Sequence, residues 1–280
     1  LIAEMQAAHE RDFAGFDMPV QNTGITEEHN AVRNIAGLFD ISHMGRLWFT
    51  GPEACKFLDH IVTNDVTKLE VGQIRYALVT NEQGGILDDV LVYRWDDAYA
   101  LVVNASNRPN IVNWIGQHIE GFDVAFADRT TELAMIAIQG PKALEWTQPY
   151  FEPILADLKY YTGIRTTLDG EEAYVTRTGY TGEDGCEVLA SGKVVVKLWE
   201  SLIAEHGDDG LIACGLGSRD TLRLEAAMPL YGHELDEETD PYTAGLGFGV
   251  KLQAGDFIGK EALVRFKERT DLQKRVGLVL

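Results

Sequence analysis

The chain has 280 residues, 45% of them hydrophobic and 24% charged, a composition typical of a globular protein with a sizeable core. Acidic residues outnumber basic ones 44 to 24, and the formal charge of -20 argues against nucleic acid or an anionic membrane as a partner. The three cysteines lack CxxC spacing and the seven histidines form no HxxxH or HxH pair, so neither a disulfide framework nor a metal site is indicated.

No apolar run reaches the roughly 18 to 20 residues of a membrane span. The first segment, LIAEMQAAHERDF, lacks the basic and apolar parts of a secretion signal. We therefore expect a soluble cytoplasmic protein, or one of the mitochondrial matrix if the source is a eukaryote.

Three successive strands are predicted between residues 72 and 105. The segments GQIRYALVT, ILDDVLVYR and YALVVNA are joined by the short connections NEQGG and WDDA, which predicts an antiparallel meander. The next segment, NRPNIVNWIGQHI, has Ile111, Trp114, Ile115 and His118 at helical spacing. Strands and helices mixed without regular alternation favour an α+β fold.

Two segments 89 residues apart resemble each other: FTGPEACKFLDHIV (49–62) and IQGPKALEWTQPYF (138–151). Downstream of each, 99–119 and 185–203 both read as a strand followed by an amphipathic helix with a tryptophan. We favour two diverged copies of an α+β unit with a ligand site in the cleft between them. The alternative is a coincidence of two helix starts, where Gly-Pro is common.

Two aspartates interrupt the apolar strand that follows Gly84 and Gly85. Because side chains alternate along a strand, Asp88 and Asp89 are expected on opposite faces, one of them among large apolar neighbours. A buried ionised carboxylate needs donors or a ligand beside it. The alternative is a turn-associated acid that bonds the backbone near the glycines. The expected faces are Ile86, Asp88, Val90 and Val92 on one side, and Leu87, Asp89, Leu91 and Tyr93 on the other.

The segment TRTGYTGEDGCEVLA (176–190) predicts a tight glycine-rich loop that runs into a strand. It matches neither a phosphate loop nor a dinucleotide fingerprint. Tyr180 offers an aromatic face, and Glu187 is an acid within an apolar strand. A solvated acidic hairpin is the alternative interpretation.

The segment CGLGSRDTLRLEAAMPLYG predicts a helix with Ser218 as N-cap, reaching about Met228. Arg219 and Arg223 lie four residues apart, a like-charge spacing that an anion must offset. That anion is either an acid of the same helix, Asp220 or Glu225, or a bound carboxylate or heterocycle edge.

Six motifs occur along the chain in the order FAGFDMPVQ, AVRNIAGLFDISHMG, TNEQGGILDDVLVY, RTGYTGEDGCE, GLGSRDTLRLEAAMPLYG and DFIGKEAL. Together they closely resemble the T protein family of the glycine cleavage system, the tetrahydrofolate-dependent aminomethyltransferases. The resemblance covers essentially the whole chain. It implies that the methylene of an aminomethyl group, carried by the lipoyl arm of the H protein, passes to tetrahydrofolate, with release of ammonia and formation of 5,10-methylenetetrahydrofolate.

The resemblance also implies roles for individual residues. Asp89, the second acid of GGILDD, is the implied catalytic carboxylate near the N5 and N10 edge of the folate. Glu187 is implied to accept two hydrogen bonds from the pterin, with Tyr180 and Arg219 beside it. The remaining implied cavity wall consists of Met44, Tyr76, Val90 and Asn104.

The family fold implied by this resemblance has two related α+β lobes and a C-terminal β-barrel around a central folate cavity. We expect one lobe from 1–46 with 130–245 and the other from 47–129 with 246–272. Residues 273–280 would begin a barrel that is otherwise absent from this chain. A basic patch of Arg219, Arg223 and Arg46 or Lys251 would attract the anionic folate. The implied partner is the lipoylated H protein, and a monomer is favoured.

Two other functions remain open at this point. One is a folate-dependent demethylase or methyltransferase that acts on a methylated amine or sulfonium. The other is a non-enzymatic folate-binding protein of the same fold, whose iron–sulfur maintenance relatives carry a K-G-C-Y-x-G-Q-E stretch where this chain has DFIGKEAL.

Overall fold

The computed structural model describes residues 10–271 and 276, and the chain divides into two compact units. Unit 1 comprises Leu1–Met44 and Thr130–Met228, and unit 2 comprises Gly45–Arg129 and Pro229–Leu280. Segment 229–245, expected in the first lobe, thus groups with unit 2, where Leu235 and Ala244 pack in one apolar cluster with Leu78 of the sheet. The expected start of a barrel lies almost entirely outside the described residues.

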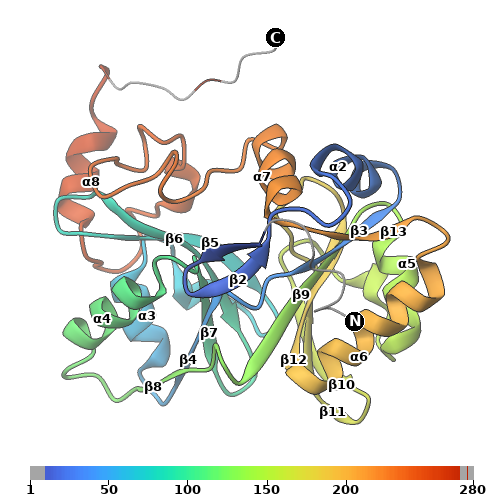
Figure 1. The fold of residues 1–280 in the computed structure, drawn as a ribbon. Helices are drawn as coiled ribbons and strands as arrows, with labels where there is room; N and C mark the ends of the chain where they lie inside the picture. Colours follow the sequence, from blue (N-terminus) through green and yellow to red (C-terminus); the bar gives the residue numbers. More distant parts are fainter. Residues whose placement is uncertain (1–9, 272–275, 277–280) are drawn as a thin grey trace. The chain divides into compact units, whose positions relative to one another are not determined.

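Unit 2 is built on a five-stranded antiparallel sheet in the order β5-β6-β7-β4-β8 (Figure 1). The predicted meander is confirmed as β5, β6 and β7, and the predicted helix as α4. The strands are β4 (Gly45–Thr50), β5 (Ile74–Thr80), β6 (Ile86–Arg94), β7 (Tyr99–Val103) and β8 (Ala125–Asp128). The helices are α3 (Ala54–Ile61), α4 (Arg108–His118), α8 (Lys260–Lys267) and the 3-10 turns η1 (Val66–Lys68) and η4 (Gly247–Gly249).

Two apolar clusters use the two faces of this sheet. Helices α3 and α4 contribute Phe57 and Ile111 to a cluster that contains Val90 and Val92 of β6. The segment after residue 229 contributes to the second cluster, which contains Leu78 of β5. The sheet is therefore covered on both sides, which explains its continuous apolar strands.

Strand β6 contains a bulge that corrects the predicted faces. Asp88 pairs with Val79 whereas Ile86 pairs with Thr80, so Leu87 is an extra residue in the ladder. Ile86 consequently packs in the cluster of Leu78, and Leu87 packs against the opposite cluster. The prediction for these two residues was wrong because bulges shift the alternation, and they are common beside functional sites.

Unit 1 has a six-stranded sheet in the order β10-β11-β12-β9-β3-β13, antiparallel except for β13 beside β3 (Figure 1). A hairpin of β1 (Glu10–Phe13) and β2 (Phe16–Pro19) precedes it. The sheet strands are β3 (Ala36–Asp40), β9 (Leu133–Gln139), β10 (Gly163–Leu168), β11 (Glu171–Thr176), β12 (Gly185–Ser191) and β13 (Leu211–Cys214).

The helices of unit 1 form two groups. Helices α5 (Ala143–Thr147) and α6 (Gly192–His206) bury Trp146, Val194 and Leu198 against β9 and β12. Helices α2 (Ile25–Asn34) and α7 (Leu216–Glu225) pack on each other, as Figure 1 shows, and α2 also contacts β3 and β13. The 3-10 turns are η2 (Gln148–Tyr150) and η3 (Leu155–Asp157).

Four strands of each unit share one topology. The order β5-β6-β7-β4 of unit 2 matches β10-β11-β12-β9 of unit 1, and both sets are antiparallel. A glycine in the left-handed region directly follows each of the strands β4 and β9: Gly51 (φ 106°) and Gly140 (φ 130°). In both cases a proline and then a helix come next. A Cβ on Gly140 would lie 2.7 Å from the backbone oxygens of Val32 and Ile35. The shared topology supports the interpretation of two diverged copies.

Across residues 10–271, no helix is both long and apolar enough to cross a membrane. The α+β class with antiparallel sheets, predicted from the sequence, is confirmed.

Candidate active site

A tight turn precedes β6 and fixes the position of its two aspartates. The Asn81 side chain accepts hydrogen bonds from the backbone N–H groups of Gln83 (3.0 Å) and Gly85 (2.9 Å). Gly84 has φ 84°, and a Cβ on Gly85 would lie 1.7 Å from the carbonyl oxygen of Glu237. Both glycines of the motif are therefore required, one for its conformation and the other for a close backbone approach.

Asp88 is fully buried and accepts three N–H hydrogen bonds. The backbone N–H of Asn104 lies 3.0 Å from Oδ2, and Oδ1 accepts from Asn104 Nδ2 (2.7 Å) and Asn107 Nδ2 (3.0 Å). Burial, and after it the charge of Asp89, raises the pKa of Asp88 to about 8 despite these donors. This carboxyl group therefore holds a proton far more readily than an exposed aspartate.

Asp89 is partly exposed and lies on the opposite face of β6. Asn104 Nδ2 donates to its Oδ1 (2.8 Å), and the hydroxyl of Tyr76 donates to its Oδ2 (3.1 Å). Burial raises the pKa of Asp89 to about 6, while these two donors lower it. The Tyr76 ring in turn stacks on Phe248, with 5.4 Å between ring centroids. Asp89, Tyr76 and Asn104 thus meet as the sequence analysis expected.

The other two residues expected beside Asp89 have different surroundings. Val90 is 2% exposed, and its side chain packs in the apolar core with Phe57. Met44 is partly exposed and ends unit 1, its N–H bonded to the carbonyl of Ile41 (3.0 Å).

Glu187 of β12, in unit 1, is also a buried acid and is 5% exposed. The Thr178 hydroxyl donates to its Oε2, and Thr178 also lies 2.6 Å from the Thr176 hydroxyl. Burial raises the pKa of Glu187, and Thr178 and the charge of Arg219 oppose that rise. The Arg219 guanidinium lies over the Tyr180 ring, 4.8 Å from its centroid. Glu187, Tyr180 and Arg219 are therefore neighbours, as expected.

Hydrogen bonds to Gln139 and Arg33 hold the loop that carries Tyr180. The buried Gln139 side chain donates to the carbonyl of Thr178 (3.1 Å) and accepts from the Thr181 hydroxyl (2.9 Å). Arg33 donates to the carbonyl of Thr181 (2.7 Å). A Cβ on Gly179 would lie 1.9 Å from Gln139 Oε1, so this loop position requires glycine. The position of Tyr180 thus depends on residues distant in sequence.

Helix α7, which presents Arg219, begins earlier than predicted. Its N-cap is Gly215, and Ser218 lies inside the helix, where its hydroxyl donates to Glu28 (2.7 Å). The prediction of Ser218 as N-cap was wrong because Glu28 of α2 supplies the acceptor for the Gly215 N–H (2.8 Å). The buried Glu28 therefore joins α2 to the start of α7.

The structure shows which anion offsets the charge of one of the two helix arginines, Arg223. Arg223 is 3% exposed and forms an ion pair with Asp220 (2.8 Å). Arg46 is fully buried. Neither side chain can therefore contribute to an exposed basic patch, and that prediction was wrong for both. Arg219, over Tyr180, remains the arginine of this helix beside the buried Glu187.

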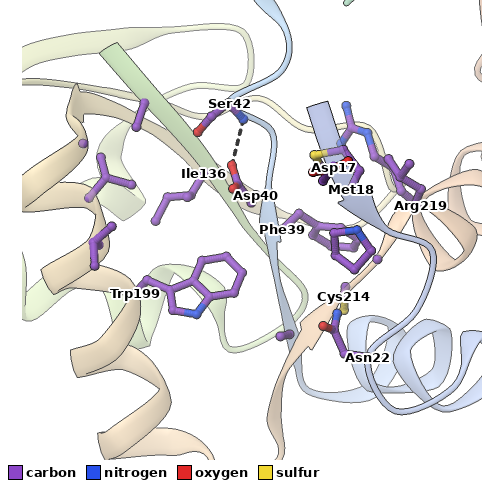
Figure 2. A pocket seen from close by; sticks show the side chains of 18 residues that line it. Asp17, Met18, Asn22, Phe39, Asp40, Ser42, Ile136, Trp199, Cys214 and Arg219 are labelled. Carbon is purple, nitrogen blue, oxygen red and sulfur yellow. Dashed lines mark hydrogen bonds between the residues drawn. The ribbon is translucent and has the colours of Figure 1, made fainter. Parts of the chain in front are cut away.

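A pocket of unit 1, shown in Figure 2, has a free space of about 970 Å³, its open mouth included. Trp199, Phe39 and Ile136 form part of its apolar wall, and Asp40 accepts a hydrogen bond from the Ser42 N–H (2.9 Å) at its side. Of the predicted site residues of unit 1, Arg219 lines this pocket, whereas Glu187 and Tyr180 do not. Among residues 10–271 and 276, no three His, Cys, Asp or Glu side chains converge as metal ligands would.

Comparison with known proteins identifies the family of this chain. The GCVT N-terminal domain family matches residues 2–254. Aminomethyltransferases of Symbiobacterium thermophilum and Rubrobacter xylanophilus are 46% and 47% identical, with coverage of 95% and 96% of this chain and 73% and 72% of their own lengths. The glycine cleavage system aminomethyltransferase T of Bartonella henselae superposes with a TM-score of 0.87 at 33% identity, covering 95% of this chain and 73% of that one.

The fold and the matched sequences together define an α+β protein of the aminomethyltransferase type. The chain belongs to the GCVT family. The enzyme class predicted from the sequence, an aminomethyltransferase, is confirmed by these relatives.

Proposed function

We propose that this protein transfers the methylene of an aminomethyl group, carried on the lipoyl arm of a glycine cleavage H protein, to tetrahydrofolate. The observation that carries the proposal is the environment of Asp89, a carboxylate with two donors, a raised pKa and a partly open surface. Such a group accepts a proton near neutral pH, as a general base must. The sequence similarity to aminomethyltransferases indicates the reaction that this base would serve.

The residues around Glu187 fit a reduced pterin. A pterin presents an amino group and a ring amide N–H side by side, and a carboxylate accepts two such donors in parallel. Glu187 is buried, so its charge is weakly screened and its hydrogen bonds are strong. Tyr180 adds an aromatic face that stacks on planar rings. We therefore propose Glu187, Tyr180 and Arg219 as folate-binding residues, together with Tyr76, Asn104, Met44 and the backbone of Val90.

The proposed transfer needs a group that accepts a proton, and we assign this role to Asp89. When bound, tetrahydrofolate supplies two nitrogens that replace the amine and the sulfur on the methylene carbon, and their two hydrogens complete ammonia and the dihydrolipoyl thiol. Asp89 would accept a proton as the first new C–N bond forms and release it to a leaving group. Tyr76 and Asn104 hold its two oxygens in place meanwhile. Apolar walls that exclude water would protect the reactive carbon from hydrolysis.

The lipoylated H protein is the partner that this reaction requires, and we propose that the chain meets it as a monomer. We also propose that units 1 and 2 are the two related lobes of the family, with the boundary after Met44 rather than after residue 46. The formal charge of -20 implies that the partner docks through local complementarity, and that attraction weakens with salt.

Two measurements test the proposal. An aminomethylated dihydrolipoyl donor and tetrahydrofolate should give ammonia and 5,10-methylenetetrahydrofolate in equal amounts, whereas a methylated sulfonium should give no product. Transfer from the sulfonium alone would establish a demethylase instead. Folate binding without either transfer would establish a binding protein.

A calorimetric titration with tetrahydrofolate examines the binding residues separately. Glu187→Gln keeps the size of the side chain but replaces one acceptor oxygen with a donor, and should weaken binding at least tenfold. Glu200→Gln, the same change at an exposed position of α6, serves as the control. Equal affinities of the two variants would remove Glu187 from the folate site.

A further inference from the structure

Asp88 lies beside the proposed catalytic acid but has no part in the reaction just described. Its link to Asp89 is a single amide: Asn104 Nδ2 donates to Asp88 Oδ1 at 2.7 Å and to Asp89 Oδ1 at 2.8 Å. The same nitrogen also lies 3.2 Å from the backbone carbonyl oxygen of Asp89, so its two hydrogens serve three acceptors on these adjacent residues. A change in one carboxylate therefore affects the other through this nitrogen as well as through the direct interaction of their charges.

Asp88 also fixes the backbone that carries this amide. Its Oδ2 accepts the Asn104 N–H (3.0 Å), and its Oδ1 accepts Asn107 Nδ2 (3.0 Å), which also donates to the carbonyl of Leu87 (2.9 Å). The connection from β7 to α4 is thus tied to β6 by one buried carboxyl group. Without it, Asn104 would lose two of its contacts at once.

Among the described residues no ion pair joins Asp88 or Asp89 to an arginine, lysine or histidine. The titratable groups that face them are each other, Tyr76 from β5 and Tyr231 from the segment after residue 229. Two negative charges on one amide in apolar surroundings repel each other, so one proton is favourably retained.

We propose that Asp88 is a positioning residue that orients Asn104 and whose ionisation is coupled to that of Asp89, so that the two carboxylates titrate as a pair. In this pair the more exposed Asp89 carries the charge toward the reaction, and Asp88 stays neutral until Asp89 has ionised. Asn104 holds the two groups in register. Only the kinetic consequence rests on the proposed function, because the pairing itself is a property of the protein alone.

Carbon-13 NMR of the protein labelled at aspartate carboxyl carbons tests the pairing without any ligand. The Asp89 signal should follow pH in two steps, its own ionisation and that of Asp88. Asp88→Asn should leave a single step. Asn104→Ala should raise the pKa of Asp89, since the variant loses a donor that favours the charged form.

The reciprocal variant, Asp89→Asn, tests the pairing even if the Asp88→Asn protein does not fold. In Asp89→Asn the pKa of Asp88 should fall, because the repelling charge is gone. Asp96→Asn, at the exposed β6–β7 turn, should change neither titration. One-step titration of Asp89 in the unaltered protein, or no response of either acid to replacement of the other, would overturn the proposal and leave Asp88 a structural residue.

The kinetic consequence separates positioning from binding. Asp88→Asn should lower kcat by roughly tenfold, as loss of a group that orients a reacting side chain does at other sites, with KM for tetrahydrofolate little changed. A rise in KM with kcat retained would contradict the positioning role. If the unaltered protein transfers no aminomethyl group, the proposed function fails, but the NMR titrations still decide whether the two acids are paired.

Discussion

The hydroxyl of Tyr76 donates a hydrogen bond to Oδ2 of Asp89 across neighbouring strands, at 3.1 Å. The two residues lie on β5 and β6, whose register is set by the turn at Gly84 and Gly85, so the sheet itself holds this pair. A donor to the charged form of a carboxyl group lowers its pKa, and this bond partly offsets the effect of burial on Asp89.

Tyr76→Phe should therefore move the acid limb of the pH–activity profile to higher pH. The ring and its stack on Phe248 are retained, and the donor to Asp89 is lost. We expect a shift of about one pH unit, the equivalent of one charged hydrogen bond. Tyr99→Phe, whose hydroxyl faces Cys55 instead, should leave the limb in place. An unchanged limb in Tyr76→Phe would show that Asp89 does not set it.

Asp88 should make the protein less stable as pH rises. Its pKa is about 8 in the folded state and near 4 when unfolded, so between these values the folded state binds more protons. The free energy of unfolding should fall across this window by an amount on the order of a few kcal/mol. Asp88→Asn should lack this component, and urea unfolding of both proteins from pH 5 to 8.5 measures the difference. Parallel pH curves would contradict it.

Arg33 should control the order of the loop that carries Tyr180. Its guanidinium bonds the carbonyl of Thr181 and the carboxylate of Glu183. Arg33→Gln should speed hydrogen exchange of the amides in residues 178–184 and weaken tetrahydrofolate binding. Arg165→Gln removes an exposed ion pair of the same unit, with Glu172, and should do neither. Unchanged exchange in Arg33→Gln would show that Gln139 alone holds the loop.

Gly85 should tolerate no side chain. The Cβ of Gly85→Ala would overlap the carbonyl oxygen of Glu237, and backbone has to move to relieve it. We expect a loss of roughly 1 to 3 kcal/mol in unfolding free energy. Gly116→Ala, in α4 with open space around it, should instead gain about 0.5 to 1 kcal/mol. Denaturant unfolding compares the two, and similar effects of both changes would contradict the turn geometry.

Local patterns predicted much of this fold. The meander of β5, β6 and β7 and helix α4 followed from residue spacing, because period and turn residues are encoded within about ten residues. The bulge at Leu87 did not follow, since it depends on the pairing of β6 with β5. Ser218 was misread as a cap because its true acceptor, Glu28, lies 190 residues earlier in the chain.

In the candidate site, too, some residues could be predicted from the sequence and others could not. Asp89, Tyr76 and Asn104 were expected together from the family resemblance, and they share hydrogen bonds. The sequence analysis did not name Asn107 or Gln139, whose roles depend on contacts with Asp88 and with a loop 39 residues away. An asparagine ahead of a predicted helix signals a cap at most, and a single glutamine in a strand signals nothing. Such supporting residues emerge only from tertiary packing.

The most direct test of this account is the rate of 5,10-methylenetetrahydrofolate formation from an aminomethylated dihydrolipoyl donor, measured for the unaltered protein and for Asp89→Asn. The amide keeps the shape of the side chain but loses its charge and basicity, so turnover should fall by at least about a hundredfold. Folate affinity should stay within a few-fold, and Asp96→Asn should retain full turnover. Undiminished turnover in Asp89→Asn would contradict the account.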